Sequence, residues 1–202
     1  MGCLRRRTGS RITGSIKTYM IMKKIFFNDK LGLTQAVLDG RKTMARQIVP
    51  FTFREDKMHL SRYKVGEIYA IAQSYETVYH EQGLETLDML VSSWKNSKGW
   101  RNKLFVRADA MTHHIRIINV KIERLQDIDD ESCMKEGIGK YFLGFDSPHT
   151  DCMGFTYSFD ESGKYKYPNA KQAFVALICK LLGKCIWESN PFMFVYEFEL
   201  ID

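Results

Sequence analysis

The residues best suited to chemistry in this sequence are three cations that follow a short predicted helix. Leu33 and Val37 are four residues apart, as on one face of a helix, and Gly40 is a typical residue at a helix end. The cations that come next are Arg41, Lys42 and Arg46. Because regular backbone flanks them, a lysine in this stretch can be held against the floor of a pocket. The alternative is that these cations only complement the helix dipole at its C-terminal end.

The spacing of apolar residues predicts the elements that position these side chains. Strands are expected at 25–27, 43–49, 65–75, 102–107, 114–124 and 192–200, and helices at 33–39, 84–94, 129–136 and 169–182. In the strand at 114–124 the apolar phase slips between Ile117 and Ile118, which predicts a β-bulge. In the last strand the even positions are aromatic or leucine, which predicts one buried face.

The length of 202 residues suits one domain. Residues 1–22 have no hydrophobic pattern and are predicted to form a disordered basic arm, read either as an upstream extension of the start or as a nucleic-acid-binding arm. Residues 23–202 are predicted to form the domain, with inserted segments near 76–100 and 139–168. Residues 1–24 hold seven of the 30 basic residues and no acidic one, so the remainder carries 23 basic and 24 acidic side chains. Any cationic surface on the body must therefore be local.

Composition excludes several classes of protein. No apolar run approaches the roughly 18 residues that a membrane span needs, so no membrane association is expected. The five cysteines are odd in number and contain no C-x-x-C pair, which favours a reducing cytoplasmic compartment over a disulfide framework. The residues that could suggest a metal, His113, His114, His149 and Cys152, lack the paired spacing of a zinc site. No metal or other cofactor is expected.

Several segments, taken in order, resemble the ASCH domain, a member of the PUA-like superfamily. They are Gly40-Arg41-Lys42-Thr43, the predicted strand Tyr63–Gln73 with its Val65-Gly66-Glu67 entry, Leu125–Ile138 with a helix ending at Glu136-Gly137, Ala173-Phe174, and Trp187–Pro191 leading into Val195–Leu200. The resemblance spans approximately residues 24–202.

The resemblance implies an α+β fold, a small and mostly antiparallel β-barrel flanked by helices, with a cleft near Lys42. ASCH proteins are generally thought to bind RNA or coenzyme-like small molecules. A compact bacterial branch removes the acetyl group from N4-acetylcytidine with a Lys, a Thr three residues later and a Glu. Lys42 and Glu136 match the Lys and the Glu, but Ala45 stands at the Thr position and lacks the nucleophilic hydroxyl. Thr43 is displaced from it by about 6–7 Å along a strand.

Basic and aromatic residues from segments near the implied cleft could contact phosphates and stack on an unpaired base. The predicted ligand-binding set is Arg41, Lys42, Arg46, Arg54, Tyr75, Trp100 and Arg107; further cations are Arg62, Arg101, Lys103 and Arg116. The alternative is a solvated charged surface over aromatic residues that belong to the core.

The sequence thus predicts binding of RNA or a modified nucleoside in a cationic cleft lined by Arg41, Lys42, Arg46 and Glu136. The alternative is an amidohydrolase-type enzyme that removes an acyl group from a modified nucleoside such as N4-acetylcytidine, through Lys42 and Glu136 with Thr43 as a substitute nucleophile. A third possibility is a purely structural Lys42–Glu136 ion pair. In each case the two side chains should meet. Lys42 is expected to be partly exposed, so that its removal changes stability little.

Overall fold

The computed structural model describes residues 22–50, 57–83, 88–142, 155–160, 165–183 and 186–201. The predicted N-terminal arm, apart from Met22, lies outside these ranges. So do Arg54, His149 and Cys152.

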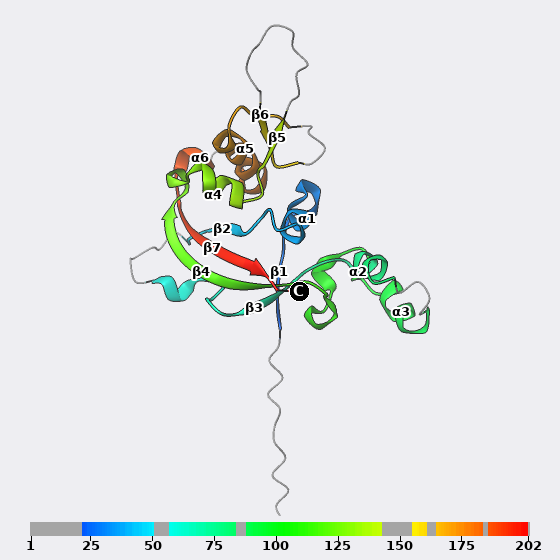
Figure 1. The fold of residues 1–202 in the computed structure, drawn as a ribbon. Helices are drawn as coiled ribbons and strands as arrows, with labels where there is room; N and C mark the ends of the chain where they lie inside the picture. Colours follow the sequence, from blue (N-terminus) through cyan, green and yellow to red (C-terminus); the bar gives the residue numbers. More distant parts are fainter. Residues whose placement is uncertain are drawn as a thin grey trace, which may run out of the picture.

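Five strands form one mixed sheet in the order β1-β3-β4-β7-β2 (Figure 1). They are β1 Lys23–Ile25, β2 Met44–Ile48, β3 Ile68–Ile71, β4 His114–Arg124 and β7 Phe192–Leu200. β1 runs parallel to β3, and the other neighbours are antiparallel. The predicted α+β class is confirmed. Among the described strands β1 and β2 remain edges, so a closed barrel is not formed by these pairings.

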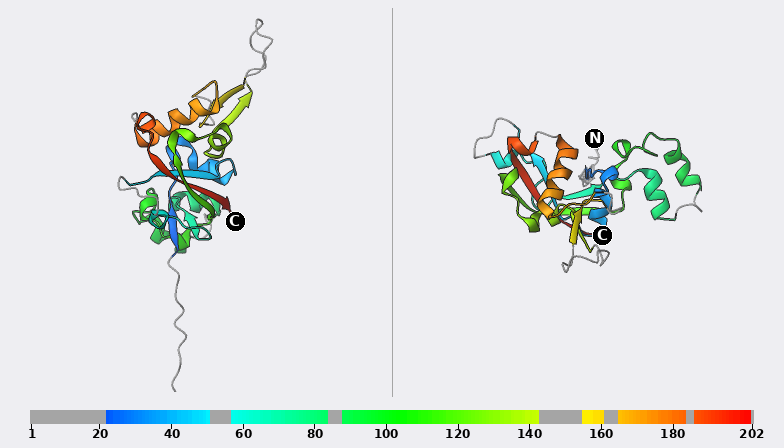
Figure 2. Two further views of the ribbon diagram at one scale, coloured as in Figure 1. Left: turned by 90° about the vertical axis from the view of Figure 1, so that its left-hand side faces the viewer. Right: turned by 90° about the horizontal axis from the view of Figure 1, so that it is seen from above.

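The remaining elements surround this sheet. They are α1 Leu33–Leu38, α2 Tyr75–Glu81, α3 Asp88–Lys95, α4 Asp130–Lys135, α5 Ala170–Leu182, α6 Ile186–Ser189, and a separate hairpin of β5 Gly139–Phe142 and β6 Phe155–Ser158. α4, α5, α6 and the hairpin lie together at one end of the sheet, whereas α2 and α3 project to one side (Figures 1 and 2).

The helix predicted at 169–182 is confirmed as α5. Asn169 caps its first turn by accepting a hydrogen bond from the backbone N–H of Gln172 at 2.8 Å, and Gly183 ends it. The helix buries Phe174, Leu177 and Ile178 in the main core, as its apolar period predicts. The predicted helices at 33–39 and 129–136 and the strands at 43–49, 114–124 and 192–200 are likewise confirmed.

The predicted β-bulge in β4 is also confirmed. Ile117 pairs with Phe198 and Asn119 with Glu197, which leaves Ile118 without a partner on β7 and 49% exposed. The extra residue accounts for the change of apolar phase. β7 differs from its prediction in that Met193 and Val195 are as buried as the even positions, because packed elements cover both faces of this strand.

Three strand predictions are corrected by the structure. Residues 102–107 contain a 3-10 turn, Lys103–Phe105, in place of a strand. The side chain of Asn102 accepts a hydrogen bond from the N–H of Leu104, and the ammonium of Lys24 donates to the carbonyls of Leu104 and Val106, so this backbone is satisfied without a sheet partner.

The strand predicted at 65–75 is shorter, and the one predicted at 25–27 lies two residues earlier, at Lys23–Ile25. β3 ends at Ile71 because Ser74 caps a helix, α2, by accepting a hydrogen bond from Thr77 N–H at 3.1 Å. For the predicted helix at 84–94, the described part is α3, which begins at Asp88.

Candidate functional site

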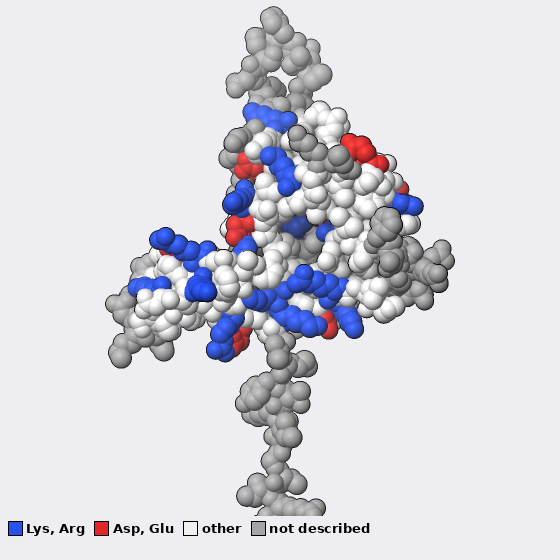
Figure 3. All heavy atoms as spheres, turned by 180° about the vertical axis from the view of Figure 1, so that it is seen from behind, with Lys and Arg blue, Asp and Glu red and all other residues white. Residues whose placement is uncertain are grey.

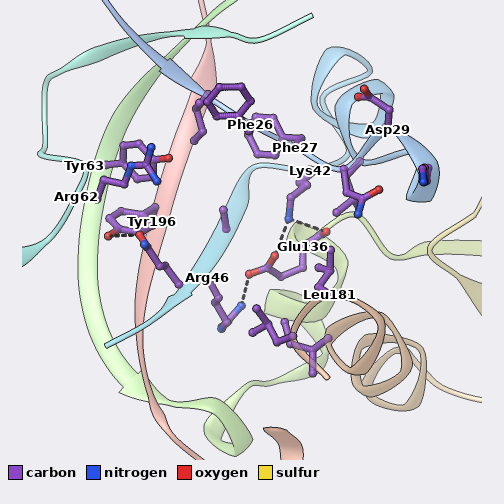
Figure 4. Close-up of a pocket in the computed structure, with 18 of the residues that line it drawn as sticks. Phe26, Phe27, Asp29, Lys42, Arg46, Arg62, Tyr63, Glu136, Leu181 and Tyr196 are labelled. Carbon is purple, nitrogen blue, oxygen red and sulfur yellow. Dashed lines mark hydrogen bonds and ion pairs between the residues drawn. The ribbon is translucent and has the colours of Figure 1, made fainter. Parts of the chain in front are cut away.

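A cavity of about 680 Å³, here called the β2 pocket, lies over β2 beside the last turns of α5 (Figure 4). Its apolar lining comes from the end of β1 and the segment after it, from α1, from the chain before β3, from α5 and from β7. These residues are Ile25, Phe26, Phe27, Leu33, Tyr63, Ile178, Leu181, Leu182 and Tyr196. Ala45 lines the pocket from β2 itself. The cavity is large enough for a nucleoside-sized ligand.

Lys42 and Glu136 meet in this pocket, 2.6 Å apart between Nζ and Oε2 (Figure 4). Their backbones also form an isolated antiparallel bridge. The predicted proximity of the two residues is confirmed, although ninety-four positions separate them. Both residues are only 4% exposed, so the expectation that Lys42 is partly exposed is wrong.

The ammonium of Lys42 has no N–H left for a ligand. Besides the Glu136 carboxylate, it donates to the backbone carbonyls of Met44 at 2.7 Å and Glu136 at 2.9 Å. A lysine ammonium has three donors, and all three are used. In this geometry Lys42 holds Glu136 in place.

Arg46 lies between the carboxylates of Glu136 and Glu123. Its guanidinium donates to Glu136 Oε1 at 2.6 Å and to Glu123 Oε1 at 2.5 Å, and its side chain is 0% exposed. It also lies 5.5 Å from the centre of the Phe174 ring. Glu123 also pairs with the more exposed Lys121 at 3.1 Å, so each charge of this floor network has a partner of opposite sign. Arg46 lines the pocket as predicted, but its guanidinium is held by two carboxylates and therefore orients Glu136.

Helix α4 presents Glu136 at its C-terminal end. Its N-cap Asp129 accepts a hydrogen bond from the N–H of Ser132 at 2.7 Å, which lowers the pKa of that carboxyl. The turn after Glu136 depends on Gly137, which has φ of +98°. A Cβ at Gly137 would lie 3.3 Å from the Cβ of Lys42, so the glycine permits both the turn and the close approach of the two chains.

Replacement of Gly137 by alanine is expected to lower the free energy of unfolding by about 2 kcal/mol, because it combines an unfavourable φ with a tight contact at Lys42. Gly66→Ala is the matched control, since Gly66 has φ of +83° but open space around its Cβ position. Urea denaturation should show the smaller loss, about 1 kcal/mol, for the control. Equal losses would mean that packing against Lys42 contributes nothing.

The structure brings only part of the predicted site together. Arg41 pairs with Asp39 at 3.0 Å and does not line the pocket, nor does Thr43. The expectation that Tyr75, Trp100 and Arg107 reach the cleft is corrected, as they belong to a second cluster around α2 and α3.

In this second cluster the ring of Tyr75 is buried and stacks on Trp94 with centroids 4.6 Å apart. Its hydroxyl accepts a hydrogen bond from the backbone N–H of Arg107. Trp100 makes an edge contact with Tyr79 at 5.6 Å. The side chain of Arg107 points to solvent and pairs with Asp109. These aromatic residues stabilise the projecting helices and are not free to stack on a base.

Sequence reasoning missed most of the pocket wall. Phe26, Tyr63 and Leu181 come from three distant segments and carry no shared spacing. The even-position aromatic pattern of β7 did point to Tyr196, but as a core residue. Burial raises the pKa of the Tyr63 hydroxyl, which therefore remains protonated at neutral pH.

The rim of the pocket is cationic. Lys30, Arg62 and Lys103 line it, and of these only Lys103 has a carboxylate partner in the described part of the chain, Asp29 at 2.6 Å. On the face drawn in Figure 3, Lys and Arg side chains gather along one edge of a hollow. An anionic group attached to a ligand would be attracted to this edge.

Other chemistry finds little support among the described residues. Burial raises the pKa of the Cys133 thiol to about 12, so it is not a nucleophile at neutral pH. Within the described ranges no three His, Cys, Asp or Glu side chains cluster as a metal site would require. None of the helices that the structure describes has the length and apolar character to cross a membrane.

No protein-family model matches the sequence, and no curated protein matches it. Among solved structures, the chain is similar to the crystal structure of a protein from Enterococcus faecalis V583 that is described as belonging to family model DUF984. The similarity covers 84% of this chain and 67% of that chain, with 12% sequence identity and a TM-score of 0.39. Similarity at this level does not indicate a shared fold or function. The proposed function therefore depends on the pocket.

Proposed function

We propose that this chain binds RNA or a modified nucleoside in the β2 pocket, as an ASCH-like member of the PUA-like superfamily whose sheet belongs to the barrel type of that superfamily. The observation that carries the proposal is the buried network of Lys42, Glu136 and Arg46 at the floor of an aromatic-walled cavity. Aromatic and aliphatic walls with a fixed polar group at one end suit a base with a polar edge.

The polar edge would be read by Glu136. A carboxylate can accept about four hydrogen bonds, and each oxygen of Glu136 accepts one side-chain donor, from Arg46 or Lys42. The remaining lone pairs can accept N–H groups of a base, whereas Lys42 has no donor to offer. Phe26, Phe27 and Tyr63 supply ring surfaces at the sides.

Binding without hydrolysis is favoured over the amidohydrolase alternative. The described residues that line the pocket include no Ser, Thr or Cys, and Ala45 occupies the position where the hydrolytic branch has its Thr. Thr43 is not in the lining, so it does not replace that nucleophile. With every Lys42 N–H already used, polarisation of a substrate carbonyl by this residue would first require breaking the floor network.

A panel of ribonucleosides, including N4-acetylcytidine, and short single-stranded RNAs tests the proposal. Isothermal titration calorimetry is expected to detect saturable binding of at least one member, and chromatography is expected to show intact N4-acetylcytidine after hours of incubation. Ala45→Thr is expected to add at most slow turnover, because a lone hydroxyl has no base to activate it. Absence of binding across the panel would refute the proposal, and rapid turnover by the wild-type chain would favour the enzyme.

A further inference from the structure

A second cavity adjoins the β2 pocket. It has a volume of about 240 Å³ and is here called the cationic hollow; its lining residues are Lys23, Lys24, Phe26, Arg62, Tyr63 and Tyr69. Phe26, Arg62 and Tyr63 line both cavities. A ligand in the β2 pocket could therefore extend past these three side chains into the hollow.

The hollow carries more positive than negative charge. The ammonium of Lys24 is held by two neutral carbonyls, those of Leu104 and Val106, so its charge is not cancelled. Arg62 lies 5.5 Å from the Tyr63 ring and has no carboxylate partner in the described ranges.

The remaining cation, Lys23, pairs with Glu67 at 3.2 Å, in a contact where the lysine side chain is 60% exposed. A hydrogen bond from Tyr69 lowers the pKa of Glu67, so this carboxylate stays charged near neutral pH. Three cations thus face one carboxylate. Exposed ion pairs of this kind contribute little to stability, so Lys23 can leave Glu67 and pair with another anion.

The floor of the β2 pocket and the cationic hollow differ in charge as the two ends of a nucleotide do, and the cationic rim residue Arg62 lines both cavities. At the floor of the β2 pocket Lys42 and Arg46 are both paired with carboxylates, those of Glu136 and Glu123, and Glu123 also pairs with Lys121 at 3.1 Å. The adjoining hollow has an excess of positive charge. A nucleotide has an uncharged base at one end and a phosphate at the other, and phosphates bind Lys and Arg side chains.

We propose that the cationic hollow is a phosphate subsite, so that the ligand of the β2 pocket is a nucleotide, free or within a single strand, and not a free nucleoside. This inference rests on the proposed function. In the hollow, Lys23, Lys24 and Arg62 hold the phosphate. The partly exposed Phe26 ring separates the phosphate from the base. The basic group in Figure 3 lies close to the start of the described chain, where β1 supplies Lys23 and Lys24.

The test compares ribonucleosides, including N4-acetylcytidine, with their 5′- and 3′-monophosphates by titration calorimetry. At low salt one monophosphate series is expected to bind at least about tenfold more tightly than the nucleosides, as two to three close charge contacts would give. This advantage should shrink as salt is raised, while nucleoside affinity stays constant.

Three variants locate the effect. Lys23→Gln alters the hollow alone and is expected to weaken monophosphate binding about three- to fivefold and to leave nucleoside binding unchanged. Arg62→Gln alters both cavities and is expected to lower monophosphate affinity more than Lys23→Gln does. Lys64→Gln is the matched control. It removes one positive charge two positions after Arg62, from a residue that lines neither cavity. Its two affinities should match those of the wild type within about twofold.

The outcomes separate this inference from the proposed function. Two results would overturn the phosphate subsite and leave the nucleoside pocket standing. One is equal affinity of the wild type for nucleosides and monophosphates. The other is that Lys23→Gln weakens nucleoside binding as much as monophosphate binding. Inorganic pyrophosphate provides a probe that does not need the β2 pocket. If it binds the wild type but not Lys23→Gln or Arg62→Gln, while no nucleoside or nucleotide binds, the anion site stands and its assignment to nucleotides is overturned. Absence of all binding overturns both proposals.

Discussion

Glu136→Gln is expected to lower the free energy of unfolding by about 3–5 kcal/mol, the usual cost of removing one partner from a buried ion pair. The substitution keeps the side-chain volume but leaves the charges of Lys42 and Arg46 without the carboxylate that holds both of them. Both cations are almost fully buried, so the loss of their shared carboxylate is only weakly compensated by solvent. Urea denaturation monitored by circular dichroism measures the loss.

Lys42→Met provides the comparison. It removes one of the two cations that pair with Glu136 and leaves two carbonyls without a donor, but Glu136 keeps its pair with Arg46, so the expected loss is smaller, about 1–3 kcal/mol. The double variant should lose less than the sum of the two single variants, because the second substitution removes one of the unpaired charges. If Glu136→Gln is within about 1 kcal/mol of the wild type, the floor network does not stabilise the fold.

Ala45→Phe is expected to abolish ligand binding, with an affinity loss of about 100-fold or more, while the chain remains folded. Ala45 lies on β2 opposite Tyr196 and lines the pocket, so a phenyl group would occupy the volume that a base needs. Aromatic residues are well tolerated in strands, and the group enters an existing cavity without disrupting packed atoms. Binding is measured with whichever panel member binds the wild type.

Ile48→Phe is the matched control for this substitution. Ile48 lies on the same strand, is exposed and does not line the pocket. It should bind the ligand as the wild type does. Undiminished binding by Ala45→Phe would place the ligand somewhere other than the β2 pocket and would contradict the proposed function.

Features that depend on neighbouring residues could be predicted from the sequence alone. The boundaries of α5 follow from the Asn169 cap and Gly183, and the bulge at Ile118 follows from a shift in apolar phase. Both signals act over a few residues, where the side chain and the backbone it satisfies are close in the chain. The approach of Lys42 to Glu136 was expected only from the resemblance to the ASCH domain.

Two local predictions failed because tertiary contacts supplied what the sequence pattern did not include. Residues 102–107 have the composition of a strand, but the ammonium of Lys24, 80 or more positions away, satisfies the carbonyls of Leu104 and Val106. Tyr75 continues the alternation of β3, yet it begins a helix and stacks on Trp94. Strand propensity is weak compared with such contacts.

The character of the site was decided by the tertiary structure. A sequence shows that Lys42 and Arg46 are charged but not whether protein encloses them, and burial turned both from ligand-binding cations into supports for Glu136. The walls of the pocket come from segments that only folding brings together. Burial and pairing depend on residues that are far apart in the chain, and no spacing rule encodes them. The sequence alone therefore determined which charges and helix ends were present, and the packing of the sheet against α4 and α5 determined which of those charges a ligand can meet.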